Sequence, residues 1–170
     1  MTSVLRAIPA ALLLLLGLFV GLDLPDLDQH LPFLGHRSAL THSVLAAALL
    51  WRRWPAFAGG LAFGIGVHLL ADLFPNAMTG YATVKLPLLG SIGPLATYLW
   101  LGLNAWAALV LAAVALARLP GLFSLGAAAV AATVALAYLF RTDGGWWALL
   151  LIAALTLAVR GFASRRQRSR

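Results

Sequence analysis

Six apolar runs, separated by short polar segments, make up most of the chain. A helix needs roughly 20 apolar residues to cross the hydrocarbon core of a bilayer, and most of the runs approach that length. The run at 39–54 would be only about 25 Å long as a helix, so it can cross only if His42 lies inside its first turn. The pattern predicts an all-α polytopic membrane bundle of about six transmembrane helices. The runs cover residues 4–22, 39–54, 56–74, 94–119, 122–140 and 146–159.

Composition supports the membrane class and a single domain over residues 1–170. With 62% hydrophobic residues, 10% charged residues and a mean hydropathy of +0.94, the chain lies outside the soluble globular range. The motif-bearing part covers about 20–90, an apolar helical part covers 94–160, and a basic tail covers 160–170. Cysteine is absent, so a metal site in this chain would have to use nitrogen and oxygen ligands.

The basic residues predict an orientation, because cytoplasmic loops of membrane proteins collect Lys and Arg. With the six runs crossing in turn, one side holds nine of the twelve basic residues and the other holds three. We therefore expect both termini in the cytoplasm and the segment at 23–42 on the outer face. Basic residues flank apolar runs, so the pI near 11.4 indicates topology and membrane lipid, not nucleic acid. The nine are Arg6, Arg52, Arg53, Arg118, Arg160, Arg165, Arg166, Arg168 and Arg170, and the three are Arg37, Lys85 and Arg141.

Eight of the nine acidic and histidine residues fall between Asp23 and Asp72. Ionisable groups at membrane depth are costly, so a sequence keeps them there when they pair, bind an ion or carry chemistry. Imidazole and carboxylate together are the ligand set of zinc and similar metals. The clustering predicts a site, although the run of acids at 23–28 is also compatible with a solvated loop. The eight are Asp23, Asp26, Asp28, His30, His36, His42, His68 and Asp72.

His68 and Asp72 are four residues apart in an apolar run, so a helix presents both on one face. We expect them to meet His42 and at least one of Asp26, Asp28 and His36 in a shared metal site. The alternative is a buried His–Asp pair that only holds helices together.

Two further features leave alternatives open. Arg37 can neutralise a carboxylate, clamp a substrate phosphate through its guanidinium, or simply mark the membrane interface. The segment at 75–93 contains Tyr81, Lys85 and a Leu-Pro-Leu-Leu sequence. It can form a flap over the site or a plain connection anchored by Tyr81.

Three ordered motifs resemble a known family. They are P-D-L-D at 25–28, G-H-R with T-H-S at 35–43, and G-V-H-L-L-A-D at 66–72. They look like those of the bacterial inner-membrane, predicted metal-dependent hydrolases of the YdjM type, over about residues 20–90. That family is thought to be related to zinc-dependent phospholipase C and P1-type nucleases, so the resemblance implies phosphoester hydrolysis in the inner membrane. It implies Asp28, His36, His42, His68 and Asp72 as metal ligands, with Asp26 and Arg37 as supporting groups.

The function expected on this basis is hydrolysis of a phosphoester or ester of a membrane-associated substrate by metal-activated water. Asp26 would be the general base, and Arg37 would stabilise developing negative charge. The chain has no Glu and only four His, so one or two metal ions are expected and three are not. The alternatives are a proton-coupled or ion-coupled transporter and a non-catalytic scaffold with a structural metal.

Overall fold

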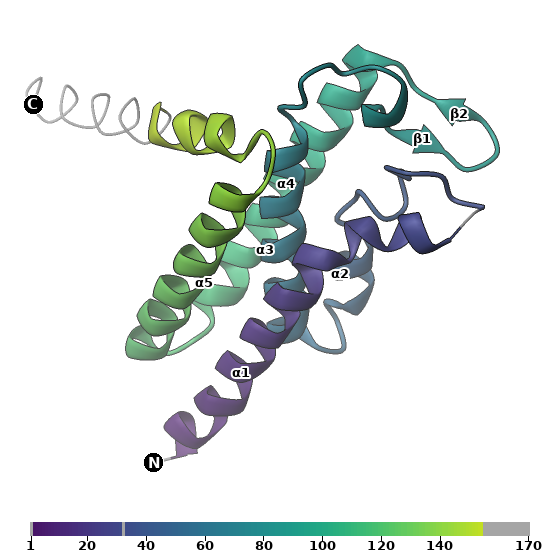
Figure 1. Ribbon diagram of the computed structural model, residues 1–170. Coiled ribbons are helices and arrows are strands. Elements are labelled where there is room, and N and C mark those ends of the chain that lie inside the picture. The colour runs from purple at the N-terminus through teal and green to yellow at the C-terminus, as the bar shows by residue number, and fades with distance from the viewer. Residues whose placement is uncertain (1, 32, 155–170) are drawn as a thin grey trace, which may run out of the picture.

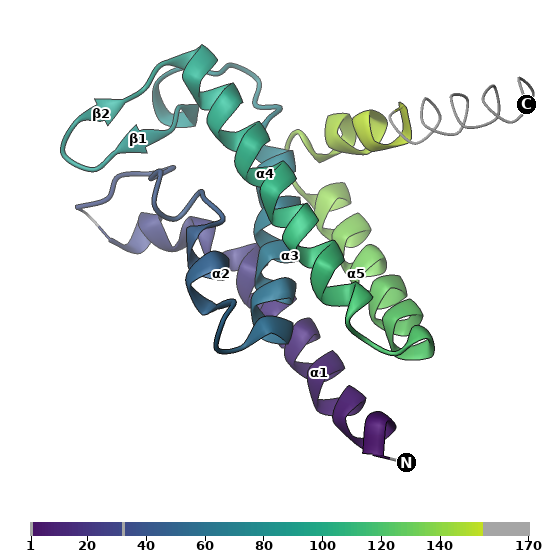
Figure 2. The same cartoon turned by 180° about the vertical axis from the view of Figure 1, so that it is seen from behind.

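The structure is a computed structural model that describes residues 2–31 and 33–154. It is helical apart from one small hairpin (Figures 1 and 2). A further short apolar helix covers Gly145–Ala154. In chain order, the other elements are α1 (Thr2–Asp23), the 3-10 helix η1 (Pro25–His30), α2 (Leu45–Leu50), α3 (Pro55–Asp72), the 3-10 turn η2 (Gly80–Ala82), β1 (Lys85–Leu86), β2 (Gly90–Ser91), α4 (Pro94–Ala117) and α5 (Gly121–Arg141).

Four helices of the described part are long and apolar enough to cross a membrane. The membrane class and the all-α class are therefore supported, but the expected count of about six is not confirmed. The run at 39–54 forms turns and the six-residue helix α2 instead of one continuous helix. The run at 146–159 is described only to residue 154, where its ten-residue helix lies crosswise to α5 (Figure 1). The four candidate spans are Leu5–Asp23, Pro55–Asp72, Pro94–Ala117 and Gly121–Arg141.

Glycines let α1 and α3 pack with their backbones in close approach. A Cβ atom added at Gly60 would clash with the carbonyl of Leu14, and one added at Gly21 would clash with the carbonyl of Leu61. Small residues allow this kind of approach between membrane helices. The contact register advances in the same direction along both helices, so α1 and α3 run parallel. The ends that carry the acidic segment and Asp72 therefore lie together.

A parallel pair requires the chain between α1 and α3 to return along the bundle, and residues 33–54 make this return (Figure 2). Polar groups from α4 support its broken backbone. The Asn104 side-chain oxygen accepts a hydrogen bond from the Val44 backbone N–H at 3.0 Å, and the Trp100 indole donates to the His42 carbonyl at 2.8 Å. Backbone groups of an irregular segment inside a membrane bundle need such partners, because lipid offers none. Asn104, the one strongly polar side chain of α4, therefore has a structural role.

The remaining helices complete the bundle around α3. Contacts of Gly59 with Ala115 and of Gly66 with Leu109 show that α4 runs antiparallel to α3, and α5 then returns towards the site end. The β1–β2 hairpin pairs Lys85 with Ser91, and lies at the same end as the loop at 33–43 (Figure 1).

Basic residues mark the opposite end of the bundle. That end carries the start of α1, the loop before α3 and the α4–α5 connection. Within the described part these segments hold Arg6, Arg52, Arg53 and Arg118. The arginines at 160–170, on which the nine-to-three count also depends, lie outside the described residues.

Candidate metal centre

Residues from four separate elements meet at the end of the bundle where α1 and α3 finish. Pro25 begins η1 directly after α1, so the chain turns there and holds its acids beside α3. The loop before α2 brings two histidines and an arginine, and α5 adds a tyrosine. The side chains involved are Asp26, Asp28, His36, Arg37, His42, His68, Asp72 and Tyr138.

The centre of this group is the Oδ2 atom of Asp72. It lies 3.2 Å from Nε2 of His42 and 3.5 Å from Nε2 of His68. The two imidazole rings are 5.5 Å apart between centroids and nearly perpendicular. His42 is completely buried and His68 is 4% exposed, so both imidazoles are shielded from bulk solvent. The expected convergence of His42, His68 and Asp72 is present in the structure.

Asp28 holds His42 in position from the side opposite Asp72. Its Oδ2 atom lies 3.2 Å from Nδ1 of His42, and it accepts hydrogen bonds from the Ser38 backbone N–H at 2.7 Å and the Thr41 hydroxyl at 2.8 Å. Burial alone would raise the pKa of Asp28, but the hydrogen bonds from His42, Ser38 and Thr41 outweigh it and lower the pKa. A carboxylate on Nδ1 leaves Nε2 of the histidine free to bind a metal. The geometry thus favours a supporting role for Asp28 over the expected role of direct ligand.

His68 is oriented in a comparable way by groups from α1 and α5. Its Nδ1 atom lies 2.8 Å from the Leu22 carbonyl oxygen and 2.8 Å from the Tyr138 hydroxyl. The carbonyl can only accept, so Nδ1 carries the proton and Nε2 presents its lone pair to the site. Tyr138 was not among the predicted site residues, because it is separated from His68 by 70 residues. The feature of the sequence that could have indicated it is a tyrosine near the end of the apolar run at 122–140.

Arg37 neutralises a carboxylate, which was one of its three expected roles. Its Nη2 atom donates to Oδ1 of Asp72 at 2.7 Å, and Nη1 donates to the Ala82 carbonyl at 2.6 Å. Arg37 is nearly buried and has a φ of 57°, in the left-handed region that costs a non-glycine residue about 1–2 kcal/mol. This contact leaves the other oxygen of Asp72, Oδ2, facing the two histidines.

His36 contacts Asp28 and the aromatic ring of Tyr81. Its Nδ1 atom is 3.7 Å from Oδ1 of Asp28, and its ring stacks on Tyr81 with 3.8 Å between centroids. Burial lowers the pKa of His36, which favours the neutral ring. The ring centroid is 6.3 Å from that of His42. The structure therefore places His36 against Asp28, in the wall of the same pocket that His68 and Asp72 line.

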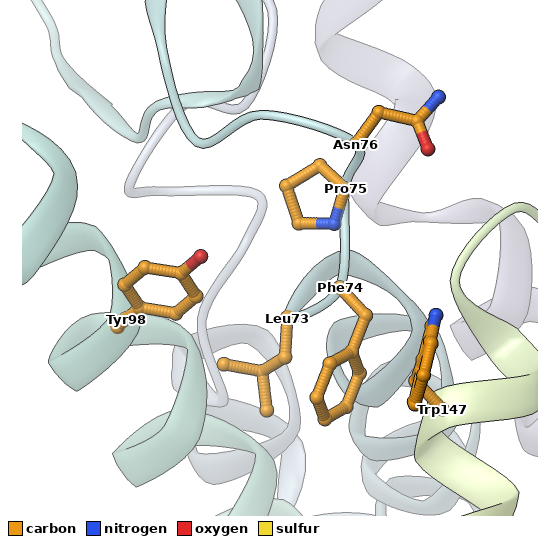
Figure 3. Close-up of a pocket in the computed structure, with 6 residues that line it drawn as sticks. All are labelled: Leu73, Phe74, Pro75, Asn76, Tyr98 and Trp147. Atoms are coloured by element: carbon orange, nitrogen blue, oxygen red, sulfur yellow. The ribbon is translucent and has the colours of Figure 1, made fainter.

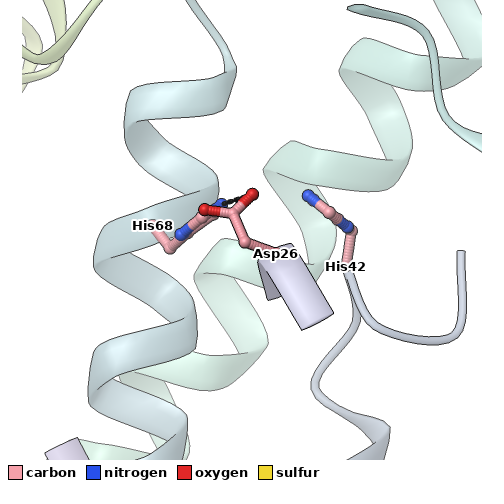
Figure 4. A group of neighbouring side chains, drawn as sticks. All are labelled: Asp26, His42 and His68. Carbon is pink, nitrogen blue, oxygen red and sulfur yellow. Dashed lines mark ion pairs between the residues drawn. The ribbon is translucent and has the colours of Figure 1, made fainter. Parts of the chain in front are cut away.

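Asp26 occupies the open side of the group. Its Oδ1 atom lies 3.9 Å from Nε2 of His68 and accepts a hydrogen bond from the Gln29 side chain at 2.7 Å. Asp26, His42 and His68 each offer one ligand atom, and these atoms lie within 4.8 Å of one another (Figure 4). Asp26 was expected as a base, and its position also makes it a candidate ligand.

Orphaned polar atoms show that this donor set suits a metal ion. In the described part of the chain, five buried side-chain atoms have no hydrogen-bond partner, and all five belong to this group: Asp28 Oδ1, His36 Nδ1, Arg37 Nε, His42 Nε2 and Asp72 Oδ2. Buried polar atoms are normally satisfied, so these atoms need an explanation. Bonds of about 2 Å to zinc in a tetrahedral site put ligand atoms roughly 3.3 Å apart. The 3.2 and 3.5 Å separations around Asp72 match that value.

The site opens into a polar pocket of about 380 Å³. Its walls include Asp143, an acid outside the predicted site, and Tyr81 from the segment at 75–93. That segment is therefore part of the site wall and not a plain connection. The pocket is lined by Asp26, His36, Arg37, His68, Ala71, Asp72, Pro75, Asn76, Tyr81, Ala82, Tyr138, Thr142 and Asp143.

These observations define the chain as a helical membrane protein with a buried His–Asp cluster that can hold a metal ion. Comparisons with family models, with curated proteins and with solved structures found no match to this chain. The YdjM-type resemblance therefore stays a prediction carried by the motifs alone.

Proposed function

We propose that the protein is a membrane-bound metal-dependent hydrolase of a phosphoester or ester on a membrane-associated substrate. The observation that carries the proposal is the buried pair His42 Nε2 and Asp72 Oδ2, which lacks hydrogen bonds in the described part of the chain and lies beside a solvent-accessible pocket. His42, His68 and Asp72 would hold a divalent metal, with zinc as the expected ion. Three protein ligands and an open position are typical of catalytic zinc.

The residues around the pocket have distinct tasks in this proposal. When bound, the metal would activate water and stabilise negative charge at the reacting centre. The side chain of Asp26 is 46% exposed and reaches the pocket, so it can accept the proton of an attacking water. Arg37 lines the same pocket, but its contact with Asp72 favours holding that carboxylate over clamping a substrate. Asp28 fixes His42 in the required tautomer.

The two alternatives are less well supported. A proton relay across the membrane needs ionisable groups along several helices, whereas α4 has no Asp, Glu, His, Lys or Arg. A structural metal is normally closed off by four protein ligands. Here Asp26, His68 and Asp72 all line an open pocket, which favours a catalytic centre over a scaffold.

The test is metal content and hydrolysis measured on the same preparations of purified protein. Zinc should bind at about one equivalent or more, and zinc-loaded protein should hydrolyse members of a panel of phosphodiesters, phosphomonoesters and carboxylic esters. His42→Ala should lose both metal and activity, while His30→Ala should keep both, because His30 is exposed. Wild-type protein that binds zinc and hydrolyses none of the panel would support the scaffold. Wild-type protein that binds no divalent metal would overturn the proposal.

A further inference from the structure

A second pocket lies next to the polar one and has a different lining. Its volume is about 520 Å³, within the range of small-molecule sites. Figure 3 shows Leu73 and Phe74 between Tyr98 on one side and Trp147 on the other. The remaining wall is Pro75 and Asn76, which also line the pocket beside the metal centre. The two pockets therefore meet along one short stretch of chain directly after Asp72.

We infer that this second pocket, which we call the aromatic pocket, binds the hydrocarbon chain of a lipid whose phosphoester head lies at the metal centre. The inference rests on the proposed function and adds the class of substrate. An amphipathic molecule needs a charged site beside one lined mainly by aliphatic and aromatic side chains, and the shared Pro75–Asn76 wall joins two such pockets. A small soluble phosphoester would leave the aromatic pocket unused.

The position of the aromatic pocket in the bundle also favours a lipid chain. It lies where α3 ends and α4 begins, at the ends of two candidate spans. Tyr98 is 42% exposed and Trp147 is 62% exposed, so the aromatic rim faces the surroundings of the bundle. Tyr and Trp are enriched at the level of lipid headgroups, where one end of the ring is wet and the other is apolar. A chain from the adjacent leaflet can enter there without passing through water.

Crosslinking tests the occupant without requiring catalysis. A phosphatidylglycerol with a diazirine near the middle of one acyl chain is incorporated into phosphatidylcholine vesicles containing the His42→Ala protein, and the labelled residues are mapped by mass spectrometry. Label is expected on Phe74 and Trp147. Label confined to outward-facing residues of α4, such as Leu103 and Trp106, would overturn the inference. Because His42→Ala should not hydrolyse the lipid, the labelled residues report where the chain lies and do not depend on turnover.

Hydrolysis by zinc-loaded protein provides the second arm. Trp147→Ala should lower kcat/KM about tenfold for a long-chain phospholipid, mainly through KM, and leave a short-chain phosphoester with the same head unchanged. Trp106→Ala, which removes an exposed tryptophan outside the pocket, should change neither substrate. Equal losses on both substrates, or no loss on the long-chain one, would overturn the chain-binding role. If wild-type protein hydrolyses neither substrate while the crosslinks still map to the pocket, the proposed function fails and lipid binding stands.

Discussion

The carboxylate of Asp28 contacts Nδ1 of His42 at 3.2 Å, while Nε2 of the same ring lies 3.2 Å from Asp72. One imidazole thus links the 3-10 helix after α1 to the end of α3. The ring is fully buried, so its orientation is fixed by these two carboxylates.

Asp28→Asn should weaken metal binding without removing a ligand. The amide holds Nδ1 of His42 less strongly, and loss of such a supporting carboxylate typically costs 10–100-fold in metal affinity. Competition titration with a fluorescent zinc chelator measures the change. Asp23→Asn is the matched control and should leave affinity unchanged, because Asp23 is exposed. A complete loss of metal in Asp28→Asn would instead indicate that Asp28 is a direct ligand.

Asp26→Asn should separate the two roles open to Asp26. If it is the general base, zinc stays bound and turnover falls roughly 10²–10⁴-fold. Metal content and kcat are measured on one preparation. Protein that loses its zinc would show that Asp26 is a ligand, as its 4.8 Å grouping with His42 and His68 allows. Full activity with zinc retained would exclude both roles.

Gly60→Val should disrupt the α1–α3 contact, because a Cβ at this position meets the Leu14 backbone. Overpacking of this kind typically costs 1–3 kcal/mol, and here it also moves the Leu22 carbonyl away from His68. Thermal unfolding in detergent and zinc affinity should both decline. Gly102→Val serves as the control, since a Cβ there meets nothing within 4 Å. Equal stability of the two variants would contradict the tight helix pair.

Asn104→Leu should destabilise the return segment before α2. The Val44 N–H loses its acceptor, and an unsatisfied buried donor costs about 1–3 kcal/mol. The drop in unfolding free energy can be measured by denaturant titration in mixed micelles. Thr133→Val, an exposed position on α5, should stay within about 0.5 kcal/mol of wild type. Asn104→Leu at wild-type stability would mean that the segment does not depend on α4.

The end of the bundle that carries the site should face outwards, as the basic residues predict. The natural chain has no cysteine, so single cysteines introduced by Phe33→Cys and Arg53→Cys can be labelled selectively. Phe33 is 70% exposed near the site, and Arg53 is exposed at the opposite end. A membrane-impermeant maleimide should label the first in intact cells and the second only after permeabilisation. The reverse pattern would place the site on the cytoplasmic face.

Hydropathy alone predicted the membrane class and the positions of α1, α3, α4 and α5, because burial in lipid demands long apolar helices regardless of their neighbours. It could not predict that the run at 39–54 would break. Val44 finds a hydrogen-bond acceptor 60 residues away on Asn104, and only the packed bundle supplies that alternative to a continuous helix.

The sequence by itself indicated the His42, His68 and Asp72 group, because a helix fixes the spacing of His68 and Asp72 and the charges of this apolar chain are clustered. It did not indicate Tyr138 or Asp143, which the fold brings to the same site. Only the tertiary structure decided which of these side chains face the centre of the site and which orient the histidines. The parallel packing of α1 and α3 places the Leu22 carbonyl on His68, and the turn at Asp28 places a carboxylate behind His42. Which ring nitrogen faces the centre depends on these contacts between distant segments, and local spacing carries no information about them.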